Sequence, residues 1–400
     1  MSTMTLHNEK KKTLVPKLRF QEFTNEWKSK KLENWNLKVI DGDRGANYPN
    51  GNDFSFEGYC LFMNAKNVTK NGFSFETKMF ITKEKDEKLR KGKLKRNDLV
   101  LTTRGSVGNI AYYNNSIKYD HLRINSGMVL IRNENSLIDS NFLYISFVTP
   151  KLNKIIDTIA FGSAQPQLTV KEINLFKISI PTLPEQQKIA SFLSAVDEKI
   201  QQLSRKKIIL EQYKKGIMQQ LFSGKLRFKN ENGEDYPDWE EKKLGDVLKI
   251  GSGKDYKHLE NGTIPVFGTG GYMLSVNKYL HNGETVFIGR KGTIDKPFYF
   301  DGKFWTVDTL FYTHSFKNTT PKFIYCVFQQ INWKLHNEAS GVPSLSKSTI
   351  EKLKFDFPCI SEQQKIAAFL SSIDTKIESV NQQIAQTQTF KKGLLQQMFV

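Results

Sequence analysis

The chain has 400 residues, with 59 Lys or Arg against 41 Asp or Glu, which gives a formal net charge of +18. An apolar fraction of 38% and 29 Phe residues are enough for packed cores and exclude a wholly disordered chain. A positive surplus of this size favours a polyanionic partner, nucleic acid first and an acidic membrane surface second, over a merely solvated basic surface.

The three cysteines form no C-x-x-C pair, which indicates a reducing compartment and argues against a disulfide framework or a cysteine-rich metal site. Residues 1–16 form a polar, basic tail without the apolar stretch of a signal peptide. No apolar run approaches the roughly 18 residues of a membrane-spanning helix. We therefore expect a soluble, cytoplasmic protein.

Residues 17–183 are predicted to form a first globular domain. Between about residues 29 and 181, short β-rich runs such as GYCLFMNAKNVTKNG and SGMVLIR are punctuated by Gly, Asn and Asp. Such a texture is typical of a mixed α/β domain with many turns.

A long helix is predicted for residues 184–222. From Ile189 onward, apolar residues occupy eight of ten positions spaced by alternating steps of four and three, and Lys207 and Lys214 fill the other two. A pattern sustained over five heptads is typical of a coiled coil. Pro184 suits the first turn of such a helix.

The second half of the chain repeats the first. EQQKIASFLSAVDEKI (185–200) has its counterpart in EQQKIAAFLSSIDTKI (362–377), and 18 of 38 positions agree between the two helical stretches. KLRF and W-x-x-K-K-L also occur twice, at the start of each half. A repeat of about 200 residues indicates a domain duplication. It predicts a second globular domain over 225–360 and a second long helix over 361–400.

Two helix starts are predicted from local sequence in this second half. In SLSKSTIEKL, Ser346 is expected to cap a short helix that closes the second domain. Ser361 with Gln364 is expected to form a capping box at the start of the second long helix.

We therefore predict an α+β fold, in which two α/β globular domains are separated by two long helices that form an antiparallel coiled coil with internal pseudo-twofold symmetry. The two helices have near-equivalent sequences, so they pack most simply against each other. The alternative, in which each helix packs on its own globular domain, stays open.

Motifs for catalysis or for cofactor binding are absent from the sequence. GSGK at 251–254 lacks the G-x-x-x-x-G-K-[ST] frame of a phosphate loop. YPDWEEKK at 236–243 places Asp, Glu and Lys within five positions, whereas a two-metal nuclease brings them together from distant strands. The six His residues lack metal-binding spacing. The sequence gives no reason to expect catalytic residues, a metal site or a bound cofactor.

Two glycine turns carry binding chemistry. TTRGSVGN (102–109) and GRKGTI (289–294) place a basic residue, a glycine and a hydroxyl side chain at corresponding points. Glycine lets backbone N–H groups approach a phosphate, while Arg or Lys supplies charge or contacts guanine. A purely structural β-turn is the alternative for each. The predicted DNA-binding residues, from these turns, the later loops and neighbouring positions, are Lys66, Arg104, Ser106, Asn109, Ser163, Gln165, Gln167, Tyr256, Thr269, Arg290, Lys291, Thr293, Ser340 and Ser344.

The order KLRF, W-x-x-K-K-L, variable domain, E-Q-Q-K-I-A-x-F-L-S-x-x-D-x-K-I and K-K-G-x-x-Q-Q-x-F, written twice, resembles the specificity subunit of type I restriction-modification systems. The resemblance implies two target recognition domains, at about 29–181 and 241–358, that each read one half of a split double-stranded DNA sequence. It also implies that the helices measure the gap and dock two modification (methyltransferase) subunits, with restriction/translocase subunits added to the assembly. The docking residues that it implies are Glu185, Gln186, Gln187, Lys188, Phe192, Asp197, Glu362, Gln363, Gln364, Lys365, Phe369 and Asp374.

The same resemblance implies a non-catalytic subunit of a DNA adenine methyltransferase and endonuclease complex. S-adenosylmethionine would then be bound by the partner methyltransferase, with no cofactor and no membrane partner for this chain. Because the two recognition domains share little sequence, they should read different half-sites, which makes the whole target asymmetric. A non-enzymatic coiled-coil adaptor with two protein- or RNA-binding heads is the alternative.

Overall fold

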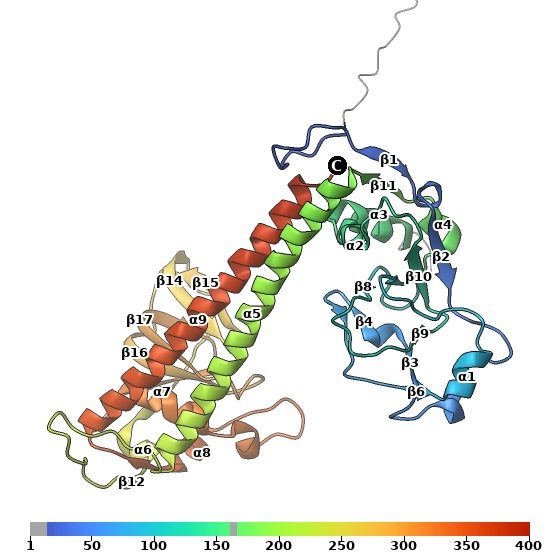
Figure 1. Ribbon diagram of the computed structural model, residues 1–400. Coiled ribbons are helices and arrows are strands. Elements are labelled where there is room, and N and C mark those ends of the chain that lie inside the picture. Colours follow the sequence, from blue (N-terminus) through green and yellow to red (C-terminus); the bar gives the residue numbers. More distant parts are fainter. Residues whose placement is uncertain (1–13, 161–165) are drawn as a thin grey trace, which may run out of the picture. The chain divides into compact units, whose positions relative to one another are not determined.

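The chain folds into two compact units. The computed structural model describes residues 14–160 and 166–400 (Figure 1). Unit 1 combines the chain up to Gln202 with Ile384–Val400, and unit 2 is Leu203–Gln383. Each unit thus holds one globular domain together with a part of each long helix, whereas the prediction from the sequence was that the helices are spacers beside the domains.

The globular domain of unit 1 consists of short strands and helices. Its strands are β1 (Lys28–Lys31), β2 (Leu37–Asp41), β3 (Cys60–Met63), β4 (Val68–Thr69), β5 (Gly72–Phe73), β6 (Phe80–Ile81), β7 (Leu99–Thr102), β8 (Ile110–Tyr112), β9 (Leu122–Ile124), β10 (Met128–Asn133) and β11 (Lys177–Ile180), and its helices are α1 (Lys83–Lys88), α2 (Ser140–Phe147), α3 (Pro150–Ala160) and α4 (Val170–Asn174). An antiparallel sheet has the order β2-β10-β7-β8, and a second sheet, β6-β3-β9, contains a parallel pair. All four side chains of β7 are buried, which explains its continuous apolar sequence.

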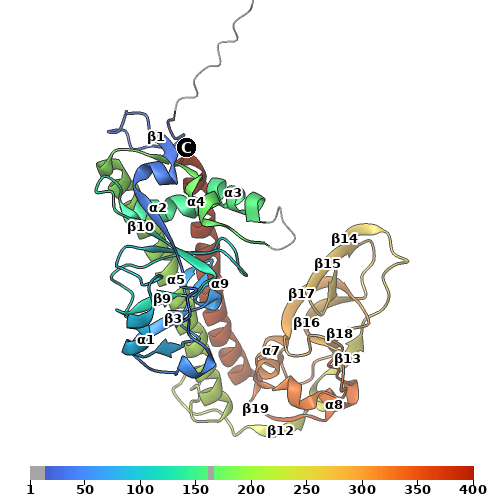
Figure 2. The same ribbon diagram turned by 90° about the vertical axis from the view of Figure 1, so that its right-hand side faces the viewer.

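The globular domain of unit 2 is built on a single six-stranded sheet in the order β13-β18-β16-β17-β14-β15 (Figure 2). Its strands are β12 (Glu240–Lys243), β13 (Lys249–Ser252), β14 (Asn261–Gly268), β15 (Gly271–Val276), β16 (His281–Gly289), β17 (Phe298–Thr306), β18 (Leu310–His314) and β19 (Lys354–Phe357), and its helices are α6 (Leu244–Val247), α7 (Pro321–Gln330) and α8 (Lys347–Lys352). Apolar side chains of α7 share one core with β16 and with the start of the second long helix. The two globular domains therefore differ in sheet architecture, in keeping with their dissimilar sequences.

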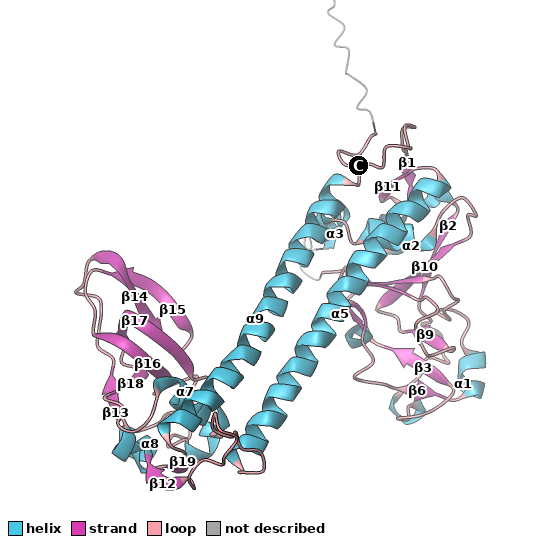
Figure 3. Ribbon diagram, turned by 60° about the vertical axis from the view of Figure 1, so that its left-hand side comes forward, coloured by secondary structure: helices cyan, strands magenta, loops and turns pink. Residues whose placement is uncertain are grey.

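The long helices are α5 (Leu183–Phe222) and α9 (Ile360–Gln397), and they run antiparallel within each unit (Figure 3). In unit 1, the Lys391 ammonium near the end of α9 donates to the Asp197 carboxylate near the start of α5. In unit 2, Lys214 near the end of α5 lies 2.7 Å from the Asp374 carboxylate near the start of α9. A lysine at a coiled-coil seam position lowers stability but fixes register, and these two lysines find a carboxylate on the facing helix.

Both packing modes considered from the sequence occur together. Ile189 and Leu193 of α5 lie in one core with Leu394 of α9 and with Phe142 of the globular domain. The helices therefore pack on each other and on the globular domain of the same unit. This confirms an α+β fold with two long helices.

The two predicted helix starts have different outcomes. Ser346 caps α8, because its hydroxyl oxygen accepts from the Thr349 N–H at 3.1 Å. The capping box at Ser361 is wrong, since α9 already begins at Ile360 and Ser361 lies inside the first turn. The Gln363 side chain instead joins this turn to the preceding chain.

A buried carboxylate ties the segment ahead of β1 to the start of α5. Glu185 is 1% exposed and accepts two hydrogen bonds from the Arg19 guanidinium, both at 2.7 Å, and one from the Trp27 indole N–H at 3.2 Å. The bond to Glu185 raises the pKa of Arg19 above its ordinary value, against the opposing effect of burial. In unit 2, the same contacts join Glu362 to Arg227 and Trp239.

The neighbouring glutamine fastens the helix start to the globular domain. Gln186 is fully buried, and its amide donates to the carbonyl oxygens of Leu137 and Pro181 while its oxygen accepts from the Asp139 N–H. Gln363 repeats this pattern in unit 2, with carbonyl acceptors on Asn318 and Pro358 and the Thr320 N–H as donor. Glu-Gln at 185–186 and 362–363 is therefore a structural pair of each unit.

An aromatic cluster lies at the end of each long helix. The Phe399 ring stacks on Phe142 with ring centroids 5.4 Å apart, and it meets the Trp27 ring edge-on at 5.9 Å. The corresponding residues in unit 2 are Phe222, Phe323 and Trp239. The repeated Trp and Phe residues are thus also explained by packing inside each unit.

We predict that Glu185→Gln destabilises unit 1 by about 2 kcal/mol or more, because it leaves the nearly buried Arg19 guanidinium without its counter-charge. Calorimetric unfolding of the purified chain measures this loss. Glu198→Gln, at an exposed position of the same helix, is the control and should stay within about 0.5 kcal/mol of the wild type. Equal stability of Glu185→Gln and the wild type would contradict the buried role.

Candidate nucleic-acid interface

In unit 1, the turn after β7 presents an exposed cation. Arg104 is exposed, and the following Gly105 has a positive φ of 72°, a conformation that glycine adopts at little cost. Arg104 forms a β-bridge with Gln167, and the Leu168 N–H donates to the Thr103 carbonyl at 3.0 Å. The Arg-Gly-Ser turn and the loop that precedes α4 therefore lie side by side.

Unit 2 has the same pairing at the corresponding residues. Lys291 is exposed, Gly292 has a φ of 86°, and Lys291 forms a β-bridge with Ser344. The Leu345 N–H donates to the Arg290 carbonyl at 2.9 Å. Both glycines thus have the structural role of a turn, and each turn also carries an exposed basic side chain beside a polar one.

Two further residues predicted in unit 1 adjoin this turn. A Cβ added at Gly105 would lie 3.9 Å from the Ala65 side chain, which places the exposed Lys66 on the neighbouring short 3-10 helix. Asn109 is half-buried, and its side-chain amide donates to the Val68 carbonyl at 3.0 Å. Lys66 and the exposed Ser106 are accessible for contacts, whereas Asn109 fastens the turn to the domain.

In unit 2, the Thr269 hydroxyl lies 3.8 Å from the position of a Cβ at Gly292, so the β14–β15 turn adjoins the Lys291 turn. Arg290 is half-buried, with its guanidinium donating to the Asp308 carbonyl at 3.3 Å and lying over the Phe311 ring. Tyr256 packs in an apolar cluster with Val266 and Trp305.

The remaining predicted contacts differ in accessibility. Thr293 is half-buried, whereas Ser340 is exposed. Ser163 and Gln165 lie outside the described residues. The structure therefore pairs Arg104 with Gln167, and Lys291 with Ser344. Lys66 and Thr269 belong to segments that adjoin these two turns. Asn109, Arg290 and Tyr256 make contacts within their own domains.

The predicted docking residues fall into two groups. Glu185, Gln186, Glu362 and Gln363 are buried and hydrogen-bonded within their units, and Asp197 and Asp374 pair with lysines of the facing helix. These six residues therefore make structural contacts within their own units, and sequence alone cannot distinguish such a contact from an exposed docking position. The accessible or half-exposed members are Gln187, Lys188, Phe192, Gln364, Lys365 and Phe369.

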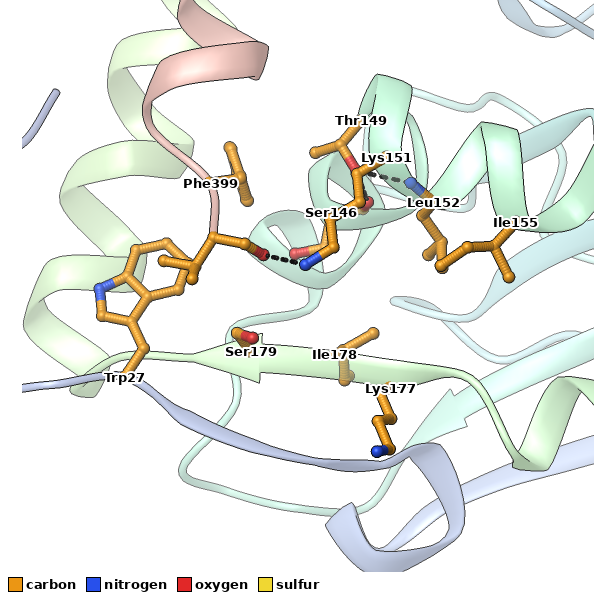
Figure 4. Close-up of a pocket in the computed structure, with 11 residues that line it drawn as sticks. Trp27, Ser146, Thr149, Lys151, Leu152, Ile155, Lys177, Ile178, Ser179 and Phe399 are labelled. Carbon is orange, nitrogen blue, oxygen red and sulfur yellow. Dashed lines mark hydrogen bonds between the residues drawn. The ribbon is translucent and has the colours of Figure 1, made fainter. Parts of the chain in front are cut away.

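A small cavity in unit 1 lies between β11, the α2–α3 corner and the end of α9 (Figure 4). Its volume is about 40 Å³, and its lining includes Trp27, Lys177 and Phe399. The Lys151 ammonium donates to the Val400 carbonyl oxygen at 2.8 Å across it. A space of this size holds a few water molecules and has no room for a nucleotide-like cofactor.

Over residues 14–160 and 166–400, no three His, Cys, Asp or Glu side chains are grouped so that they could hold a metal ion. In the same ranges, no helix combines the length and the apolar character needed to cross a membrane.

The contact of Arg19 and Trp27 with Glu185 was not predicted from the sequence. Its signal is nevertheless present in the sequence, because KLRF, the tryptophan and the glutamate recur in the same order in the second half.

Comparison with known proteins identifies the family. The model of the type I restriction modification DNA specificity domain matches residues 25–212 and 236–388. The chain is 26% identical over 335 residues to the type I restriction enzyme MjaIX specificity subunit of Methanocaldococcus jannaschii, which covers 74% of this chain and 75% of that protein. It is 24% identical over 157 residues to the EcoprrI specificity subunit of Escherichia coli, covering 37% and 39%.

The fold is also similar to that of solved structures. The S subunit of a type I restriction-modification system from M. genitalium matches with a TM-score of 0.63 at 18% identity, over 96% of this chain and 99% of that chain. The domain matches together span most of the sequence, and each falls on one of the two repeats. The chain therefore belongs to the type I restriction-modification DNA specificity family, as a specificity subunit that recognises DNA sequence through two such domains.

Proposed function

We propose that each recognition domain reads one half of an asymmetric bipartite DNA target. The observation that carries this proposal is the paired turn and loop, which recurs in both units with different chemistry. Unit 1 places Arg104 beside Gln167, and unit 2 places Lys291 beside Ser344. Arginine donates bidentately to guanine and glutamine bonds adenine, whereas lysine and serine offer a point charge and a hydroxyl. Two different side-chain sets favour two different half-sites.

The long helices would set the gap between the half-sites and dock two modification subunits, with restriction/translocase subunits joining the complex. Catalysis would then belong to the partners, and S-adenosylmethionine would bind to the methyltransferase subunits in the cytoplasm. Docking on the long helices is supported by their exposed positions, such as Gln187 on α5 and Gln364 on α9, which are accessible to a partner. The adaptor alternative is not favoured, since DNA recognition is the property of the family to which the chain belongs.

Exchange of residues 32–176 for the matching segment of another family member should change only one half of the methylated motif. The exchange keeps β1, β11 and the Glu185 contacts, so that the unit retains its frame. Genome-wide mapping of methylated adenines, with and without the chain, measures the motif. An unchanged motif after the exchange would contradict modular reading.

Arg104→Ala should weaken binding to the cognate duplex by about 1–3 kcal/mol while leaving thermal stability unaltered, because the side chain is exposed. Asn109→Ala is the matched structural variant, expected to lower stability by about 1 kcal/mol because the Val68 carbonyl loses its donor. Fluorescence anisotropy at fixed salt and thermal unfolding separate the two effects. Wild-type affinity of Arg104→Ala would count against the turn as a DNA contact.

Insertion of seven residues into both helices, after Gln202 and after Gln383, should lengthen the gap in the target by about three base pairs. Seven residues add roughly 10.5 Å and nearly two whole turns, so the packing faces keep their orientation, and successive base pairs are about 3.4 Å apart. Adenine methylation mapping reads the new gap. A constant gap would refute the role of the helices as a ruler.

A further inference from the structure

The last turns of the two long helices share residues that the packing of this chain does not explain. None of the twelve positions in 201–212 matches its counterpart in 378–389, whereas six of ten match between 213–222 and 390–399. Identity that returns after a stretch with none indicates a constraint on these last turns beyond common descent.

Internal contacts account for part of this identity. Lys214 and Lys391 form the ion pairs with Asp374 and Asp197, and each terminal Phe stacks in its aromatic cluster. The identical residues left over are Lys215, Gly216, Gln219, Gln220 and their counterparts Lys392, Gly393, Gln396 and Gln397.

No contact or backbone conformation of the described residues explains why glycine occupies these two positions. Gly216 and Gly393 lie inside α5 and α9, although glycine is among the weakest helix-forming residues. Neither has a positive φ. Apart from the chain neighbours and the backbone of the same helix, no described atom lies within 4 Å of the Cβ that another residue would add at either position. Each glycine therefore leaves a notch on an accessible helix surface.

An exposed aromatic ring precedes each notch by one turn. Tyr213 is 49% exposed and Phe390 is 54% exposed, and neither ring stacks on another ring of the described residues. The ring, the glycine and the exposed Gln220 or Gln397 follow at i, i+3 and i+7, so they lie on one side of their helix. An exposed aromatic ring beside a glycine, with an exposed glutamine on the same side of the helix, thus occurs in each unit.

We propose that this aromatic–glycine patch, formed by Tyr213, Gly216 and Gln220 in unit 2 and by Phe390, Gly393 and Gln397 in unit 1, docks one copy of the modification subunit on each unit. The proposal rests on the proposed function, in which two such subunits bind. Aromatic side chains are frequent anchors of protein interfaces, and a small residue lets a partner helix approach closely. The partner should offer an apolar pocket for the ring and a helix or strand that approaches the glycine.

Two observations favour a protein over DNA as the occupant. The patch carries no charge, and N–H groups inside a helix are already bonded, so the glycine cannot offer donors to a phosphate. Because the same spacing occurs in both units, the occupant should be the same protein bound twice.

The test uses the full chain co-purified with its own modification subunit, and native mass spectrometry counts the bound copies. We expect two copies on the wild type, one on Gly216→Gln or Gly393→Gln, and at least a tenfold loss of affinity at both sites in the double variant. Glutamine forms helices better than glycine, so the melting temperature of the isolated double variant should equal or exceed that of the wild type. Tyr213→Ala and Phe390→Ala should weaken docking in the same direction.

Ile208→Ala is the control, because Ile208 is exposed on α5 and its counterpart is Ala385. It should retain two copies. If the double glycine variant bound two modification subunits with wild-type affinity, the proposed docking patch would be wrong. It would also be wrong if the isolated variant chain lost affinity for DNA, because that result would assign the surface to DNA. A wild-type chain that binds no modification subunit would instead overturn the proposed function and, with it, the patch.

Discussion

A buried carboxylate at the start of each long helix joins three parts of its unit. An ionised carboxylate that is removed from water is costly unless charged and polar donors surround it. Glu185 meets this condition through the Arg19 guanidinium and the Trp27 indole, which belong to the segment ahead of β1. The Glu185 carboxylate therefore holds together the helix start, this segment and the core under the tryptophan. The Glu362 carboxylate has the same role in unit 2.

The constant contacts are confined to a small part of each domain, which leaves the rest free to differ. β1 pairs with β11 in unit 1, and β12 pairs with β19 in unit 2, next to the buried carboxylate in both cases. Beyond these strands, the described residues of unit 1 form three separate sheets, of four, three and two strands, whereas those of unit 2 form one six-stranded sheet. A frame that does not depend on the sheet architecture is compatible with two domains that recognise different sequences, and both still present a basic turn against a polar loop.

Repeated polar residues along the helices have two physical origins. Glu185 and Gln186 recur because they are buried and must be satisfied, and Asp197 recurs because a seam lysine needs a carboxylate. Gly216 and Gly393 recur although, apart from their chain neighbours and their own helix backbone, no atom of the described residues lies within 4 Å of the Cβ position beside them. The first kind stabilises the subunit itself, and only the second kind indicates a surface under constraint from outside. Burial therefore distinguishes repeated residues that stabilise the subunit from repeated residues at an exposed surface, and sequence identity alone does not.

The sequence alone was sufficient for the duplication, for both long helices to within a few residues, for the cap at Ser346 and for the two glycine turns. These features depend on local periodicity, capping and turn chemistry, which neighbouring residues carry. Only the tertiary structure showed that Glu185 is buried against Arg19, 166 residues away in the chain, and that Asn109 holds its turn in place. Burial and hydrogen-bond partners depend on segments that are distant in sequence. The local sequence at a helix start is therefore the same whether a polar residue there faces solvent or a core.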